Sequence, residues 1–283
     1  MQSFKTTDTL VKWLENKRLS GDKIGFVPTM GALHEGHASL VERAKNECDC
    51  VIVSIFVNPT QFNSHDDLDK YPKSLESDMR VLFAKNCDAV FVPEVTTMYP
   101  KYPHQTNLIC IDLTDVNEVM EGKFRAGHFE GVVNVVYQFF EIIKPHKAYF
   151  GEKDFQQLAV IRRMVDVLQL PLEIVTCETV REASGLAMSS RNTRLSTPKK
   201  VEALLIYQTL ILARKLSQTH LPNEVKKLCL DNLRSGALVT EYLEICDPKN
   251  LQPLSKTWVP GARCFIAAFC DDVRLIDNME LIP

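Results

Sequence analysis

The sequence predicts an α/β protein in which a doubly wound parallel sheet is followed by a smaller α+β domain. In the first half, short β-branched runs alternate with helix-like stretches, as they do when crossover helices join parallel strands. After about residue 180, two helical stretches come first and the strand-like runs follow. The chain has 283 residues, more than one domain usually holds, so we expect two domains, 1–180 and 181–283.

The expected elements of the first domain make a Rossmann-like alternation. The continuous β-branched run 51–57 predicts a strand buried on both faces. Residues 129–144 have the β-branched content of a strand, but their length favours a helix, which Pro145 would end. The other expected elements are an amphipathic helix within 1–19, strands at 24–28, 88–93, around 108–110, 147–151 and 172–176, and helices at 37–47, 73–86 and 154–170.

The second domain begins with two stretches of helical periodicity, 197–217 and 222–234. Strand-like runs follow at 239–246 and 264–270, and the segment VRLIDN completes the pattern. We therefore expect helices packed on a small sheet.

Composition excludes several classes of protein. The formal net charge of -3 argues against nucleic acid as the main partner, and no apolar run approaches the roughly 20 residues that span a bilayer. The first residues lack the apolar stretch of a signal peptide, so we expect a cytoplasmic protein. Nine scattered cysteines without a C-x-x-C pair indicate buried thiols in a reducing compartment rather than disulfides or a metal site.

The turn after the first expected strand of the sheet carries the strongest signal of a ligand site. Gly31 and Gly36 flank ALHE there, and such a turn leaves backbone N–H groups free to meet phosphate. The turn is neither G-x-G-x-x-G nor a Walker A loop. His34 and His37 stand three residues apart, so both can reach one bound group and donate to a phosphate.

The segment FGEKDFQQL, 150–158, also joins a strand to a helix. Lys153 offers a cation for phosphate, Asp154 an acceptor for ribose hydroxyls, and Gln157 lies one turn after Lys153. The alternative is a charged start to a solvated helix.

Two further segments add polar groups. In REASGLAMSSRN, 181–192, the triplet Ser189, Ser190 and Arg191 suits a polyphosphate, and Gly185 suggests a loop that moves. Asn58 and Gln61 follow the buried strand 51–57 and could read the hydroxyl and carboxyl groups of a small ligand. The alternatives are a linker between domains and a solvated turn.

Four segments in this order resemble the pantothenate synthetase family, also called pantoate–β-alanine ligases: PTMGALHEGH (28–37), FVNPTQF (56–62), GEKDFQQL (151–158) and GLAMSSRN (185–192). The resemblance runs over essentially the whole chain. The H-x-G-H and the serine-rich loop also resemble class I aminoacyl-tRNA synthetases, but this chain lacks the length and basic charge of tRNA-binding domains.

The resemblance implies a role for each matching residue. His37 and His34 would act on the phosphates of ATP, together with Lys153, Ser189, Ser190 and Arg191. Gln61 and Gln157 would hold pantoate, with Gln61 also beside β-alanine. Arg125 and His128 would form a flap, in which Ala126 stands where the family more often has proline. The implied ATP-binding set is Met30, Gly31, Ala32, Leu33, His34, Glu35, Gly36, His37, Gly151, Glu152, Lys153, Asp154, Val180, Met188, Ser189, Ser190 and Arg191.

The implied reaction has two steps. Pantoate attacks the α-phosphorus of ATP to give pantoyl-adenylate and pyrophosphate, and β-alanine then displaces AMP to give pantothenate. Mg²⁺ would arrive with ATP and keep much of its water, without dedicated protein ligands. The resemblance also implies a homodimer and a smaller domain that helps to close the site. The competing hypotheses are a nucleotidyltransferase that stops at an adenylated product and a nucleotide-binding module without catalysis.

Overall fold

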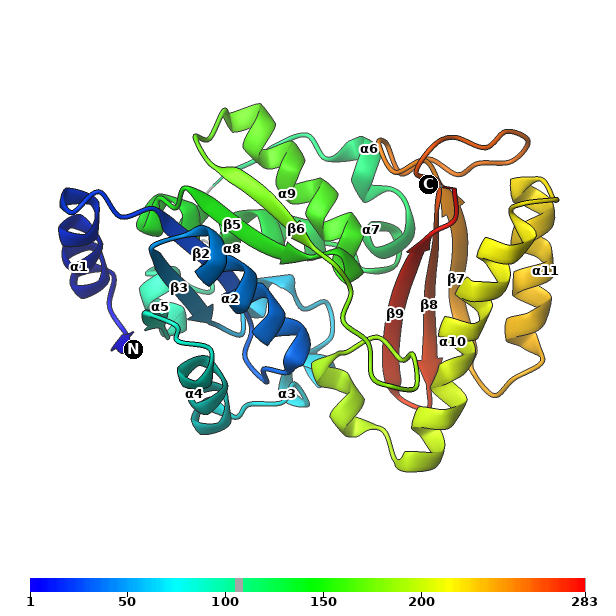
Figure 1. Ribbon diagram of the computed structural model, residues 1–283, viewed down its shortest axis with the longest axis horizontal. Helices are drawn as coiled ribbons and strands as arrows, with labels where there is room; N and C mark the ends of the chain where they lie inside the picture. The colour runs from blue at the N-terminus through cyan, green and yellow to red at the C-terminus, as the bar shows by residue number, and fades with distance from the viewer. Residues whose placement is uncertain (105–108, 283) are drawn as a thin grey trace. The chain divides into compact units, whose positions relative to one another are not determined.

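The computed structural model describes residues 1–104 and 109–282, which form two compact units (Figure 1). The first unit contains Met1–Leu113, Arg125–Glu152 and Gln157–Glu178, and the second contains Thr114–Phe124, Lys153–Gln156 and the chain from Thr179 onward. Two short segments that precede Thr179 in the sequence therefore belong with the C-terminal part.

The first unit is built on a six-stranded sheet of order β1-β4-β3-β2-β5-β6, in which every pair is parallel. From β2 the chain proceeds outward through β3 and β4, and from β5 it proceeds in the opposite direction to β6. This reversal confirms the predicted doubly wound sheet, with its switch point between β2 and β5. The strands are β1 Gln2–Phe4, β2 Ile24–Thr29, β3 Cys50–Ile55, β4 Ala89–Phe91, β5 Lys147–Gly151 and β6 Glu173–Cys177.

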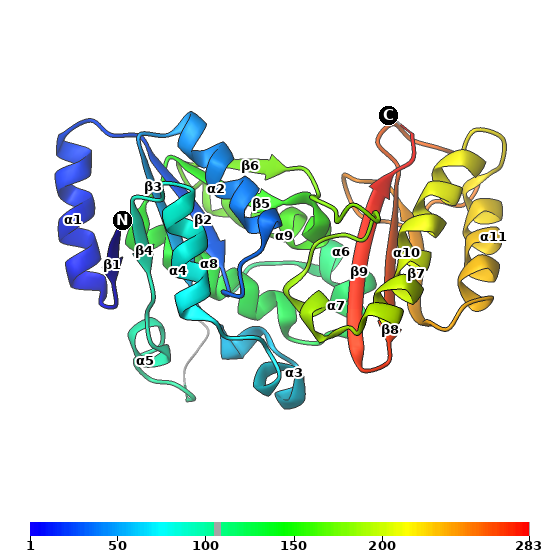
Figure 2. The ribbon, with the colours of Figure 1, turned by 60° about the horizontal axis from the view of Figure 1, so that its bottom comes forward.

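Helices cover both faces of this sheet (Figures 1 and 2). On one face, Leu40, Val41 and Ala44 of α2 pack on the valines of β3. On the other face, Phe139 of α8 contacts Phe26 and Phe91 with ring centroids 5.5 and 6.2 Å apart. The helices are α1 Thr7–Leu19, α2 Glu35–Glu47, α3 His65–Asp69, α4 Leu75–Ala84, α5 Val95–Met98, α8 His128–Ile143 and α9 Phe155–Leu168, with a 3₁₀ turn at Pro59–Gln61.

The structure corrects two of the expected elements. Gln2–Phe4 is a strand rather than the start of a helix, because it pairs with β4 at the edge of the sheet. Ile109 and Cys110 form no strand. The buried Asn134 side chain bonds both the N–H and the carbonyl of Ile109, in place of a neighbouring strand. Residue 108 of that prediction lies outside the described residues.

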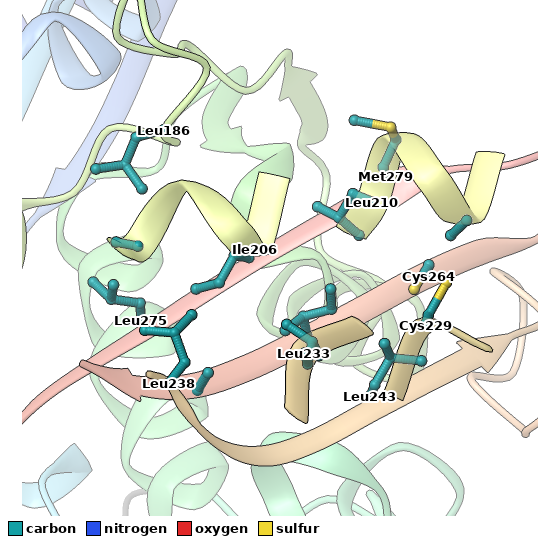
Figure 3. Close-up of a cluster of buried hydrophobic side chains, with 14 of the residues drawn as sticks. Leu186, Ile206, Leu210, Cys229, Leu233, Leu238, Leu243, Cys264, Leu275 and Met279 are labelled. Carbon is teal, nitrogen blue, oxygen red and sulfur yellow. The ribbon is translucent and has the colours of Figure 1, made fainter. Parts of the chain in front are cut away.

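The second unit contains an antiparallel sheet of order β7-β8-β9, formed by Val239–Cys246, Arg263–Cys270 and Val273–Glu280. The helices α10 Thr197–Leu216 and α11 Pro222–Arg234 pack on one face of it, and α6 Thr114–Asn117 and α7 Met120–Phe124 belong to the same unit (Figures 1 and 2). Figure 3 shows Leu210 of α10, Leu233 of α11 and Leu275 of β9 in the shared core. This unit has the helix-on-sheet arrangement that the sequence predicts.

Eight of the nine cysteines are buried and all nine are free thiols. Burial raises the pKa of Cys87 and Cys229 to about 12, so both are inert thiols at neutral pH. Cys110 is exposed, and the prediction that it lies in the core was wrong. Over the described parts of the chain, no helix has the length and apolar character needed to cross a membrane.

Candidate active site

The switch point lies where β2 and β5 run side by side, with Gly25 opposite Lys147 and Phe26 opposite Ala148. Parallel strands end at the same edge of a sheet, and ligands of open α/β sheets bind in the crevice outside that edge. The residues that follow Thr29 at the end of β2, from Met30 to His37, therefore stand at the expected position. Gly151 ends β5 at the same edge, with open space where a Cβ would project.

A buried carboxylate organises this turn. Asp78 of α4 is 1% exposed and accepts the N–H groups of Ala32 and Leu33 at 3.0 and 2.7 Å. Gly31 and Ala32 both have positive φ, and a Cβ on Gly31 would meet an Asp78 oxygen at 2.9 Å. Burial raises the pKa of Asp78, while the two backbone hydrogen bonds oppose that rise.

Four backbone N–H groups of the turn have side-chain acceptors within the protein. Besides the two that Asp78 accepts, the N–H of Gly31 donates to Thr29 Oγ1 and that of Gly36 to His34 Nδ1. The expectation that backbone N–H groups of this turn meet phosphate stays a prediction, and these four groups would have to exchange a partner within the protein for the ligand. The two histidine rings of the turn are further donors.

The rings of His34 and His37 lie with centroids 4.1 Å apart at the first turn of α2. His34 Nδ1 accepts the Gly36 N–H at 3.1 Å, and His37 Nδ1 accepts the His34 N–H at 3.4 Å. Each ring thus accepts at Nδ1, so a neutral ring carries its proton at Nε2. This reciprocal capping gives both histidines the same donor nitrogen.

A buried amide network lies beside this turn in the same unit. Gln61 is 8% exposed; its Oε1 accepts from Asn58 Nδ2 at 3.1 Å and its Nε2 donates to Met30 Sδ at 3.0 Å. Asn58 Oδ1 accepts from the hydroxyls of Tyr99 and Thr60. Both predicted readers of a small ligand are therefore held in one fixed network rather than in a solvated turn.

The first residues of α8 also hold this network. His128 is buried, its Nδ1 donates to the Gln61 carbonyl at 2.8 Å, and its Nε2 lies 3.0 Å from Arg125 Nη1. His128 is thus packed into the unit; the flap that the resemblance implies for Arg125 and His128 stays a prediction. Gly131 lies one turn further along α8 and lets the helix approach the Pro59–Gln61 turn closely. A Cβ at this position would lie 2.4 Å from the Thr60 carbonyl oxygen.

In the second unit, Lys153 and Asp154 stand together in the 3₁₀ turn Glu152–Asp154. Lys153 Nζ lies 3.5 Å from Asp154 Oδ1, and the lysine side chain is only 17% exposed. The Lys153 carbonyl accepts a hydrogen bond from Asn278 of β9 at 2.8 Å. The main chain at Lys153 is therefore fixed by the small sheet.

The segment 180–192 is a tight hairpin followed by a 3₁₀ turn, Ser190–Arg194. The N–H of Met188 donates to the Val180 carbonyl, and Arg181 pairs with Ala187. Ser189 caps the turn by accepting the Arg191 N–H at 3.3 Å, and Ser190 is buried. The hairpin thus joins Val180 directly to the serine-rich triplet.

Three residues that organise these sites escaped sequence reasoning. Asp78 and Gly131 lie far along the chain from the groups that they hold, and an acid or a glycine within a helix has many other meanings. Gln156, not Gln157, is the buried glutamine: it bonds the carbonyls of Val116 and Val119 and accepts the Glu121 N–H. Gln157 is half-buried. The sequence does not indicate which of the two adjacent glutamines faces the interior.

No group of three or more His, Cys, Asp or Glu side chains within residues 1–104 and 109–282 could hold a metal ion. The buried acid nearest the histidine turn in the sequence, Asp78, already accepts two backbone N–H groups.

A doubly wound sheet with an H-x-G-H turn at its switch point defines an α/β enzyme of the nucleotide-using kind. The sequence model of one family, pantoate-beta-alanine ligase, matches residues 2–280. The chain therefore belongs to the pantoate–β-alanine ligase family and is a ligase that uses ATP.

Curated relatives and solved structures agree. The chain is 47% identical over 285 residues to the pantothenate synthetase of Bacteroides fragilis, in a match that covers 99% of both chains. The structure of pantothenate synthetase from Thermus thermophilus is similar over 100% of both chains, with 41% identity and a TM-score of 0.93. A third relative is the pantoate-beta-alanine ligase of Francisella tularensis, complexed with beta-gamma ATP and beta-alanine; it has 35% identity, 99% and 98% coverage and a TM-score of 0.82.

Proposed function

We propose that this chain condenses pantoate with β-alanine at the expense of ATP, through a pantoyl-adenylate intermediate. Family membership supports the overall reaction, and the ligands named for the Francisella tularensis structure are ATP-like and β-alanine. The observation that carries the proposal is the pair His34 and His37 at the switch point. Both rings cap α2 through Nδ1, which leaves Nε2 of each neutral ring as the nitrogen that carries the proton.

In the first step a pantoate carboxylate oxygen bonds to the α-phosphorus, and the bond from that phosphorus to the bridging oxygen breaks. Pyrophosphate leaves with the electron pair. Negative charge grows on the departing phosphates, so a donor aimed there stabilises the transition state more than bound ATP. His37 and His34 serve as these donors through Nε2–H.

In the second step the amine of β-alanine attacks the activated carbonyl. The C–N bond forms to give a tetrahedral intermediate, which collapses as the C–O bond to AMP breaks, and the amine proton passes to solvent water. Both the in-line transfer at phosphorus and this acyl transfer need positioning and charge stabilisation rather than a protein nucleophile. The buried thiols of the chain, with raised pKa values, fit a mechanism without covalent catalysis.

Four further residues are proposed to bind the phosphates of ATP, the charges of Lys153 and Arg191 offsetting phosphate charge and the hydroxyls of Ser189 and Ser190 donating hydrogen bonds. Their chemistry supports this role: an ammonium, two hydroxyls and a guanidinium are the usual partners of polyphosphate. Mg²⁺ enters as part of the MgATP substrate, so the rate should follow the concentration of MgATP.

Gln61 and Gln157 are proposed to hold pantoate. Gln61 supports the role best, because Asn58 and Met30 fix both ends of its amide. Calorimetric titration of Gln61→Ala and Gln157→Ala should show pantoate affinity falling by about 1–3 kcal/mol with ATP affinity retained. Equal loss of ATP binding would place these glutamines in the nucleotide site.

The direct test of the function measures AMP with pantoate or β-alanine omitted in turn. A synthetase forms AMP steadily only when both acids are present. An enzyme that stops at an adenylated product would release no AMP in response to the amine. A module without catalysis would bind ATP and release no pyrophosphate with any acid.

Two wider proposals follow from the family. The chain is proposed to act in the cytoplasm and as a homodimer. Light scattering at micromolar protein should give twice the mass of one chain, which is 32.1 kDa. A mass near that of one chain would contradict the dimer.

A further inference from the structure

The strand β9 carries two adjacent polar residues in the core of the second unit. Asp277 is 5% exposed and Asn278 is 3% exposed. Side chains alternate across a strand, so Asp277 shares a face with Leu275 and Met279, which Figure 3 shows in the apolar core, and Asn278 points to the other face. Polar groups in such places cost stability unless each finds a partner, so what they bind is informative.

Asp277 holds the hairpin that precedes the serine-rich triplet. Its two oxygens accept from Arg181 Nη1 at 2.6 Å and Nη2 at 3.0 Å, a paired geometry that fixes the guanidinium plane. The same Nη1 donates to the Gly185 carbonyl at 3.1 Å, and the guanidinium stacks 4.6 Å from the Tyr207 ring centre. Asp277 therefore sets the position of the hairpin through Arg181.

Asn278 holds the other candidate phosphate segment from the opposite face. Its Nδ2 donates to the Lys153 carbonyl at 2.8 Å, and its Oδ1 accepts from Arg263 Nη1 at 2.6 Å. Arg263 in turn stacks on the Phe155 ring at 4.5 Å, two residues after Lys153. Asn278 thus fixes the main chain from which the Lys153 ammonium extends.

The charges of both segments also act on Asp277. Burial raises the pKa of Asp277, while the Arg181 guanidinium and, more weakly, the Lys153 charge oppose that rise. The Asp277 carboxylate bonds Arg181 and the Asn278 N–H. The Asn278 amide bonds the Lys153 carbonyl and also Arg263 of the neighbouring strand β8, so one of its contacts lies within the sheet and the other reaches the Lys153 turn. An apolar pair here would build the core without linking these segments.

We propose that Asp277 and Asn278 are positioning residues of the adenylation step. These two adjacent residues of β9 fix the position of Lys153 relative to the hairpin that leads to Ser189–Arg191. This inference rests on the proposed function, since it assumes that both segments bind the phosphates of ATP. Neither residue touches substrate in this account; each acts through the segment that it holds.

The test compares Asp277→Asn and Asn278→Leu with the wild type in pantoate-dependent exchange of pyrophosphate into ATP. Both changes keep the side-chain size. Misplacement of phosphate-binding groups should lower kcat/KM for ATP by about 10²-fold, while KM for pantoate stays unchanged. Glu244→Gln is the control: it breaks the ion pair at 2.6 Å between Glu244 of β7, in the same sheet, and Lys226 of α11, and it should leave both parameters unchanged.

Melting curves run beside the kinetics, with rates taken per folded molecule. If Asp277→Asn fails to fold, Arg181→Lys carries the test: it keeps the charge, loses the paired geometry and should still raise KM for ATP. Asp277→Asn combined with Arg181→Lys should be no slower than the worse single variant, because the two act as one unit.

Normal ATP kinetics in folded variants, or an equal loss toward ATP and pantoate, would overturn the positioning role. Multiplicative losses in the double variant would also contradict it. A wild-type protein without pantoate-dependent exchange would instead refute the proposed function, so the two failures are distinguishable.

Discussion

At the scale of single residues, each histidine of the H-x-G-H turn caps α2, and the donor role proposed for it uses its other ring nitrogen. Accepting a backbone N–H at Nδ1 caps α2 and at the same time directs the ring proton to Nε2. The residue types and the three-residue spacing predicted two rings able to reach one group. Which nitrogen donates could not be predicted, because it depends on the backbone geometry that Asp78 imposes from another helix.

We predict that His37→Ala lowers the rate of adenylate formation by about 10²–10³-fold, as loss of a transition-state donor does. The lost cap should cost about 1 kcal/mol of stability, so the fold should survive. Single-turnover adenylate formation and thermal melting measure the two effects separately. A variant that melts early but turns over normally when folded would show that the ring only packs the turn.

At the scale of elements, the approach of α8 to the 3₁₀ turn positions the Gln61 amide. Gly131 permits that approach, and His128 bonds the Gln61 carbonyl. The helical pattern of 129–144 could be read from the sequence, and α8 spans His128–Ile143. The need for a glycine in the first turn of α8 could not be read from the sequence, because the atoms that would clash with a Cβ belong to Thr60 and Gln61.

Gly131→Ala should therefore displace the 59–61 turn. We expect pantoate affinity to fall and ATP affinity to change less, with about 1–3 kcal/mol of stability lost to overpacking. Calorimetric titration with each substrate measures the difference. Gly236→Ala is the control, since its Cβ would meet the flexible end of Leu205 rather than backbone. If Gly131→Ala binds pantoate as tightly as the wild type does, Gly131 is not needed to position Gln61.

A charge cluster joins α2 to the end of the central sheet that lies away from the site. Hydrogen bonds from Lys147 and then Arg43 lower the pKa of Glu47 to about 2, from an ordinary 4.5. A lowered carboxyl pKa stabilises the folded state above the ordinary value, and that contribution is lost as pH falls through the folded pKa. The Glu47 side chain is 24% exposed, so the contribution should be about 1 kcal/mol or less.

The stability of Glu47→Gln should therefore lie below that of the wild type by a constant amount above about pH 5. The gap should close between pH 4.5 and pH 2. Urea denaturation over this range measures the free energy of unfolding of both proteins. A gap that stays constant or widens in acid would contradict the assigned ion pairs.

At the scale of the whole molecule, the order of elements predicted the class of both sheets. Local periodicity was sufficient because β3 is buried on both faces and the crossover helices are long and amphipathic. The membership of Thr114–Phe124 and Lys153–Gln156 in the second unit could not be predicted. It depends on tertiary contacts: Gln156 binds Val116, Val119 and Glu121, and Glu121 pairs with Arg274 at 2.6 Å.

The same limit applies to the candidate site. The sequence motifs identified the residues of the histidine turn, the Gln61 turn, the Lys153 turn and the serine-rich triplet. The groups that hold them in place, Asp78, Gly131, Asp277 and Asn278, lie in other elements and carry no local pattern.

In the proposed reaction the chain activates pantoate as a discrete adenylate before β-alanine takes part. This order can be measured as exchange of labelled pyrophosphate into ATP with pantoate and MgATP present and β-alanine left out. We expect exchange that requires pantoate, proceeds without the amine and is slowed by about 10²–10³-fold in His37→Ala. Exchange that appears only when β-alanine is present would contradict a discrete adenylate.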